Sequence, residues 1–153
     1  MYLQKEQGNI DLDSQYRLKN SDKLTGSGSL SSKPEGYVLT YRDLVRLMGK
    51  QSDNTALNIA KNILGTQIVN EAIVTSGMDS TVIFGEEQKT TPRDVGEFFR
   101  NLWQGNFLSK ESRDELLEFM TDTNFESWIV GGIPSDVRVS HKFGRELHVV
   151  NDA

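Results

Sequence analysis

Residues 40–120 carry successive amphipathic patterns with a repeat near 3.6 residues, and each pattern is framed by helix start and stop signals. Thr40 and Asp43 have the spacing of a capping box, and Ser109 caps a later pattern. The segment Thr91-Pro92-Arg93-Asp94 places an N-cap, a proline and an acid where a helix begins. This series predicts a mainly helical region.

The longest apolar series in this region begins near Asp53 and is interrupted once. Its apolar positions fall on one helical face: Ala56, Ile59, Ala60, Ile63 and Leu64. Gly65 stands where a helix C-terminus favours glycine, so we expect one helix to end there and another to run over residues 66–76.

Strand patterns are expected only near the C-terminus. Val137, Val139 and His141 alternate with polar residues up to Lys142, which predicts a strand. The segment 143–145 is read as a turn and 147–150 as a second strand, so the sheet content is one hairpin. The predicted fold class is α+β, and 153 residues suit a single domain.

Composition excludes several classes of function. The net charge of −5, without a basic patch, argues against a nucleic-acid or anionic-membrane partner. The lack of cysteine excludes disulfides, a thiol nucleophile and a thiolate metal site. No apolar run approaches the roughly 18 residues of a membrane span. Residues 10–36 are polar, and Gly26-Ser27-Gly28-Ser29 reads either as a flexible linker or as an ordered loop.

The two histidines, His141 and His148, have an odd spacing that would put them on opposite faces of a strand. We therefore expect each to be a packed or surface residue, and we expect no metal site. Phosphate-loop and dinucleotide fingerprints are absent, so no cofactor is expected. Residue counts leave a Ser-His-Asp triad open, although the sequence has no G-x-S-x-G elbow.

One constellation points to specific chemistry. Ser52-Asp53-Asn54 precedes a predicted helix, and Lys142-Phe143-Gly144 follows a predicted strand about ninety residues later. A serine at a helix entry can relay a proton, an amide can hold an acyl group, and a lysine can attract a carboxylate. Taken singly, the first tripeptide is equally an N-cap cluster, and the second is a hairpin turn with a solvated lysine.

In combination these motifs resemble class A β-lactamases and penicillin-binding serine hydrolases, whose signatures include S-D-N and K-T-G. Further segments are similar to the family's: Gly8–Asp13, Gly26–Leu30, Tyr41–Leu44, Ser52–Asn58, Thr90–Asp94 and Gly132–Lys142. The resemblance covers nearly all of residues 2–152. It implies a single partial domain with a helical subdomain over about 14–134 and a stub of the α/β subdomain over 135–153.

The resemblance also implies roles for individual residues. Ser52 would be the catalytic proton relay, and Lys142 would supply positive charge near the substrate carboxylate. Asn54 would bind the substrate amide, Gly144 would allow close backbone approach, and Asp53 would hold the loop.

The sequence departs from the family in four places. No serine has a lysine three positions later, so the S-x-x-K nucleophile is not among these residues. Phe143 replaces the substrate-binding hydroxyl residue of K-[ST]-G, which removes a hydrogen-bond donor. Residues 78–90 lack the E-x-x-L-N of class A enzymes, and neither Glu86 nor Glu87 is assigned its role. The sequence also stops before the family's last strand and helix.

The implied function is acyl transfer on a β-lactam or a peptidoglycan-like peptide through an acyl-enzyme, with this chain inactive alone. The segments of the fold that these residues lack would then be its partners. A non-catalytic binding module derived from the fold is the alternative. The first residues carry no signal-peptide pattern, so an extracytoplasmic location is implied by the resemblance alone.

Overall fold

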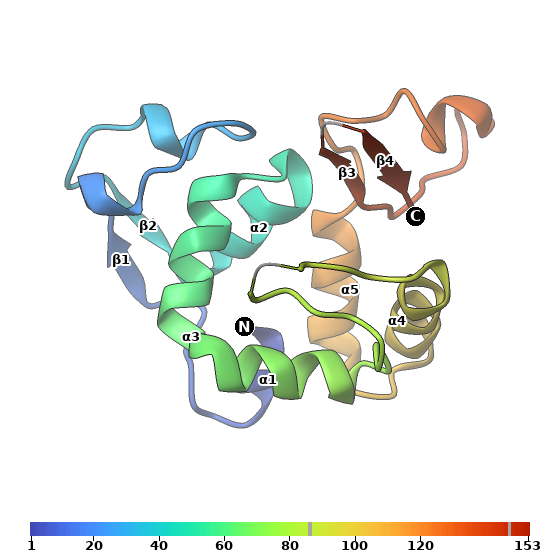
Figure 1. Cartoon of the computed structure of the whole chain (residues 1–153), viewed down its shortest axis with the longest axis horizontal. Helices are drawn as coiled ribbons and strands as arrows, with labels where there is room; N and C mark the ends of the chain where they lie inside the picture. Colours follow the sequence, from blue (N-terminus) through green and yellow to red (C-terminus); the bar gives the residue numbers. More distant parts are fainter. Residues whose placement is uncertain (86, 147) are drawn as a thin grey trace.

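A computed structural model describes residues 1–85, 87–146 and 148–153. Helices are its main regular structure, as the amphipathic patterns predicted. Their bounds are α1 (Tyr2–Glu6), α2 (Tyr41–Gln51), α3 (Asn54–Thr75), α4 (Pro92–Gln104) and α5 (Lys110–Phe119). Figure 1 shows α2, α3 and α5 around the middle of the molecule, with the C-terminal hairpin at one end. None of the described helices has the length and apolar character of a membrane span.

The predicted helix starts are confirmed at α2, α4 and α5. Thr40 accepts a hydrogen bond from the Asp43 amide while the Asp43 carboxylate accepts one from the Thr40 amide, which completes the capping box. Thr91 caps α4 with proline at the first helical position, and Ser109 caps α5.

Gly65 interrupts α3 as predicted. Its backbone, at φ 74° and ψ 165°, is not helical, and two helical segments meet there end to end. Glycine adopts this positive φ without the steric cost that a Cβ would impose. The break changes the direction of the chain between the half of α3 that carries the Ser52 region and the half that leads to residues 78–90.

The strands differ from the prediction. A second sheet pairs β1 (Gln15–Arg17) with β2 (Val38–Thr40), so the sheet content is not a single hairpin. The expectation of one sheet was wrong because three-residue strands are too short to show a repeat of two.

The C-terminal hairpin lies later in the chain than predicted. It pairs β3 (Phe143–Glu146) with β4 (Val149–Asp152), and Phe143 is opposite Asp152. The predicted strand over 137–142 was wrong, since those residues pair with none of the strands that the structure describes. The predicted turn at 143–145 is part of β3; Leu147, in the predicted second strand, lies outside the described residues.

Two apolar clusters form the core. One packs α2 and α3 against the segment after α1 through Leu18, Leu30, Leu39, Leu44, Leu47, Ala56 and Ile59. The other joins α1, α2, α4 and α5 through Tyr2, Leu12, Val45, Leu102, Leu108 and Met120. Since α2 contributes to both clusters, its position fixes the turn that follows it.

Replacing Leu44 by Ala should lower the free energy of unfolding by about 2–5 kcal/mol, because Leu44 is fully buried in the first cluster. Leu57→Ala, on the exposed side of α3, should change it by less than about 1 kcal/mol. Urea unfolding of both variants measures the difference, and equal losses would contradict this assignment of the core.

Candidate active-site cleft

The predicted site residues lie together in one cleft of about 750 Å³. The turn between α2 and α3, the loop at Gly26, strand β3 and the turn at residues 125–128 surround it. These elements are far apart in the sequence, and Figure 1 shows the β3–β4 hairpin next to the end of α5. Ser52, Asp53, Asn54, Lys142, Phe143 and Gly144 all line the cleft.

Ser52 occupies the C-cap of α2 in a left-handed conformation, at φ 49° and ψ 42°. This is uncommon for a non-glycine residue, and such positions concentrate at functional sites. Its hydroxyl accepts a hydrogen bond from the Lys142 ammonium and lies 3.3 Å from the Phe143 carbonyl oxygen, to which it donates.

Lys142 reaches Ser52 across 90 residues of sequence. Its ammonium also donates to the Phe143 carbonyl oxygen at 2.5 Å. An ammonium has three protons to donate, and two of them go to these acceptors among the described residues. Burial lowers the pKa of Lys142, and the nearby Asp152 carboxylate opposes that shift only in part.

Asp53 is buried and holds the turn between the two helices. One carboxylate oxygen accepts from the Ala56 amide at 2.9 Å, capping α3, and the other accepts from the Leu30 amide at 2.8 Å. The prediction of an N-cap at this position is therefore confirmed. The same side chain joins α3 to the loop around residue 30.

Asn54 is fixed on the same loop. Its side-chain amide donates to the Thr25 carbonyl oxygen and its backbone amide donates to that of Ser27, both at 3.0 Å. Gly26 has a φ of 107°, and a Cβ there would lie 2.5 Å from the Asn54 side-chain nitrogen. Only glycine allows this close approach.

Residues 26–29 form an ordered loop, which answers the question that their composition left open. Gly28 packs against Asp53, and an added Cβ would lie 2.2 Å from that carboxylate. The Ser27 hydroxyl donates to the Gln51 carbonyl oxygen at 2.7 Å. The loop is part of the support of the cleft, because its atoms contact two residues of the S-D-N turn.

Phe143 directs its ring into an aromatic group. It stacks on Phe125 with 4.8 Å between ring centroids and lies 5.9 Å from Trp128. A Cβ added at the neighbouring Gly144 meets nothing within 4 Å, so the cleft is open beside β3. Lys142 precedes β3 and is half-buried, so the reading of it as a solvated turn lysine was wrong.

The polar network behind Lys142 could not be found from the sequence. His141 is fully buried, and its Nδ1 lies 2.6 Å from the Asp152 carboxylate. Its Nε2 lies 2.9 Å from the Thr123 hydroxyl and 3.2 Å from Glu126. His141 is thus a packed histidine, as expected, but it lies outside β3. His148 is exposed in a turn, so the inference from strand faces was wrong.

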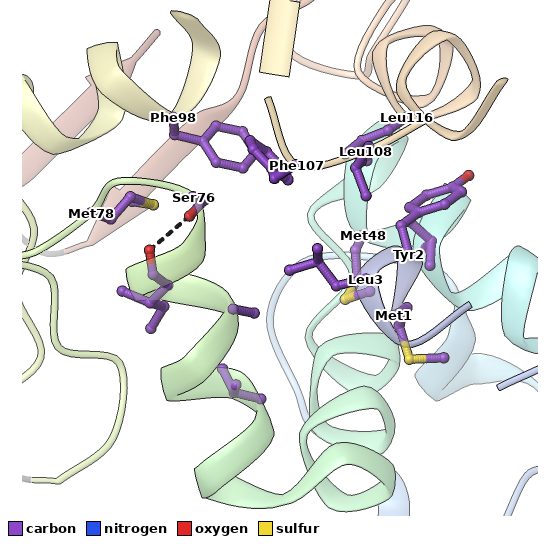
Figure 2. Close-up of a pocket in the computed structure, with 14 residues that line it drawn as sticks. Met1, Tyr2, Leu3, Met48, Ser76, Met78, Phe98, Phe107, Leu108 and Leu116 are labelled. Carbon is purple, nitrogen blue, oxygen red and sulfur yellow. Dashed lines mark hydrogen bonds between the residues drawn. The ribbon is translucent and has the colours of Figure 1, made fainter. Parts of the chain in front are cut away.

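A second, apolar cavity of about 280 Å³ lies between α1, α2, α3 and the segment from Phe98 to Leu116. Figure 2 shows Met1, Leu3, Met48 and Phe107 around it, and the Ser76 hydroxyl, which also lines it, donates to the Ile73 carbonyl oxygen. No ionisable side chain other than the tyrosine Tyr2 lines it. The cleft around Ser52 is therefore the candidate site.

Comparisons with known proteins identify the family and the fold of the chain. The profile of the beta-lactamase enzyme family matches residues 1–153, so the chain belongs to that family. No curated protein matches it significantly.

Solved structures match over 99% of the chain. A β-lactamase from Sphaerobacter thermophilus DSM 20745 is 29% identical with a TM-score of 0.91. PBP-A is 25% identical with a TM-score of 0.91, and a β-lactamase from Chitinophaga pinensis DSM 2588 is 26% identical with a TM-score of 0.88. The chain spans 61%, 60% and 64% of those chains, respectively. They confirm a β-lactamase-like α+β fold.

Replacing His141 by Ala should lower the free energy of unfolding by about 1–3 kcal/mol, because Asp152 and Thr123 would each lose a buried hydrogen-bond partner. His148→Ala is the matched control and should change it by about 0.5 kcal/mol or less. Chemical unfolding of the two variants tests this, and a harmless His141→Ala would refute a structural role for the network.

Proposed function

We propose that the cleft binds a β-lactam or a peptidoglycan-like peptide and belongs to a serine acyl-transfer site. The contact between Lys142 and the Ser52 hydroxyl carries the proposal. It places a cation, a proton-carrying hydroxyl and an open cleft together, and each is needed to bind and activate a carboxylate-bearing amide.

Each side chain has a proposed task. Lys142 attracts the ligand carboxylate with its third proton, and its charge eases transfer of the Ser52 proton to the leaving nitrogen. The proton that the attacking nucleophile releases then passes to Ser52 and replaces the one given to the leaving nitrogen, so Lys142 keeps its charge while it donates to Ser52. Asn54 presents its amide to the acyl group, while Asp53 keeps both residues in place.

Acyl transfer further requires a nucleophile. None of the serines in the sequence is followed by lysine three positions later. We therefore propose that an S-x-x-K segment outside these 153 residues completes the site, and that the chain alone binds ligand without forming an acyl-enzyme.

The deacylating carboxylate of class A enzymes also has no assigned counterpart here. The segment after α3 is short, and Val82 and Lys89 pair across it with backbone hydrogen bonds of 2.8 and 2.9 Å. Glu87 is exposed in that segment, and Glu86 lies outside the described residues. A mutant of PBP-A has been solved as an acyl-enzyme with penicillin G. We propose slow deacylation for the completed site.

The isolated chain should show no covalent labelling by a fluorescent penicillin, although it should bind benzylpenicillin reversibly.

Lys142→Ala should weaken this reversible binding about tenfold by removing the carboxylate's partner. Lys110→Ala, which removes the same charge from an exposed position on α5, should leave it unchanged. Gel fluorescence and calorimetry measure both effects. Covalent labelling would overturn the inactivity of the chain alone, and an unaffected Lys142→Ala would overturn the site.

Binding should also weaken as the pH rises. The lowered pKa of Lys142 means that its positive charge is lost at a pH below the usual range of lysine. Affinity for a peptide with a free C-terminal carboxylate should therefore fall as the pH rises, and the fall should begin below the usual titration range of lysine. Lys142→Arg keeps its charge over this range and should show no such fall. Identical profiles for both proteins would contradict this role of Lys142.

A further inference from the structure

An aromatic group forms one wall of the cleft and has no part in the chemistry above. It consists of Phe125, Trp128 and Phe143, which all line the cleft. The Phe125 and Phe143 rings are nearly parallel, at 15°, and the Trp128 ring is tilted by 31° from that of Phe143. We call these three residues the aromatic wall.

Burial differs sharply within the aromatic wall. Phe143 is 9% exposed, whereas Trp128 is 54% exposed. Packing of the hairpin explains why Phe143 is buried. It does not explain why the large Trp128 ring is exposed at the cleft. Exposed tryptophans in concave sites are typical of ligand contacts, because they supply much apolar area at a low entropic cost.

Backbone hydrogen bonds hold the wall in position. The Phe125 amide donates to the Thr123 hydroxyl at 3.1 Å, and the Ile129 amide donates to the Asp152 carboxylate at 3.0 Å. Trp128 is therefore carried by a turn anchored at both ends. A ring that is already positioned loses less conformational freedom on binding.

The wall adjoins the cation of the cleft. Phe143 directly follows Lys142, and its carbonyl oxygen accepts hydrogen bonds from both Lys142 and Ser52. Leu57 and Met48 also line the cleft, so further apolar surface faces the ligand space. A ligand whose carboxylate is held by Lys142 thus has aromatic surface beside it.

Phe143 also changes what can recognise the carboxylate. At this position the family resemblance predicts a serine or threonine, whose hydroxyl would donate a hydrogen bond to the ligand carboxylate. The phenylalanine side chain has no donor. With one donor fewer, apolar contact has to supply more of the affinity. The aromatic wall offers that contact in the same part of the cleft.

We propose that the cleft is selective for carboxylate ligands bearing an aromatic side chain, and that Trp128 is the residue that determines this preference. The inference rests on the proposed function, since it requires that the cleft binds β-lactams or acylated peptides. The ligand ring packs on the exposed Trp128 ring, which lies beside the Phe143 ring, and Phe143 in turn stacks on Phe125.

The test compares two penicillins that differ only in the side chain. Benzylpenicillin carries a phenylacetyl group, and 6-acetamidopenicillanic acid has an acetyl group in its place, with the same amide and carboxylate. Calorimetry on the 153-residue chain should show benzylpenicillin binding about tenfold more tightly. In a Trp103→Phe background, benzylpenicillin should also quench the fluorescence of Trp128, the other of the two tryptophans.

Variants separate this preference from general binding. Trp128→Ala should reduce the preference to near unity while the acetyl compound binds as before. Trp103→Ala removes an exposed tryptophan of α4 that does not line the cleft, and should retain the full preference. Trp128→Ala is expected to fold, because the ring is half exposed.

Two results would overturn the proposal, and they are distinguishable. Equal affinities of both penicillins for the unmodified chain, or a preference that survives Trp128→Ala, would refute the role of Trp128 and leave the proposed function standing. If neither compound binds, the proposed function fails and the preference fails with it.

Discussion

Asp53 is a buried anion whose two carboxylate oxygens are taken by backbone amides from different segments, Ala56 at the start of α3 and Leu30 in the preceding loop. A buried charge is tolerated only when such bonds replace its water. The turn that carries Ser52 therefore cannot move without breaking bonds to a charged acceptor, each worth about 1.5–3 kcal/mol. Gly28 fits against the same carboxylate because it has no side chain. The left-handed Ser52 is held by this arrangement.

The other half of the site depends on the C-terminal hairpin, which has no sequence-local connection to that turn. Its two strands are short, and a hairpin of this size is marginal alone. Buried polar bonds attach it instead: the His141 amide donates to the Met120 carbonyl oxygen at 2.8 Å, and the His141 ring meets Asp152 of β4. The hydrogen bond from His141 to the end of α5 thus fixes the position of the neighbouring Lys142 relative to Ser52.

Local signals in the sequence were sufficient for helices and insufficient for sheets. The helix starts at Thr40 and Thr91 and the break at Gly65 depend only on residues a few positions away in the sequence, so local patterns are sufficient to predict them. Alternation over 137–142 predicts a strand equally well, but a strand also needs a partner, and no strand of the described residues pairs with this segment. The motif residues were identifiable because their types and order matched a known family. The His141 network was not, since only the fold brings Thr123 and Asp152 to one ring.

Helix α2 separates a polar cleft from an apolar cavity. Its last turn leads to Ser52 and the polar cleft, while Val45 and Leu116 line the apolar cavity behind it, and Met48 lines both spaces. The cleft concentrates its few polar groups where Lys142 is partly desolvated, which strengthens its attraction for an anion. The Lys142 ammonium still donates hydrogen bonds to the Ser52 hydroxyl and the Phe143 carbonyl oxygen, and the second of these requires an intact start of β3. Charge and apolar surface thus enter the cleft from two consecutive residues, Lys142 and Phe143, which the start of β3 holds side by side.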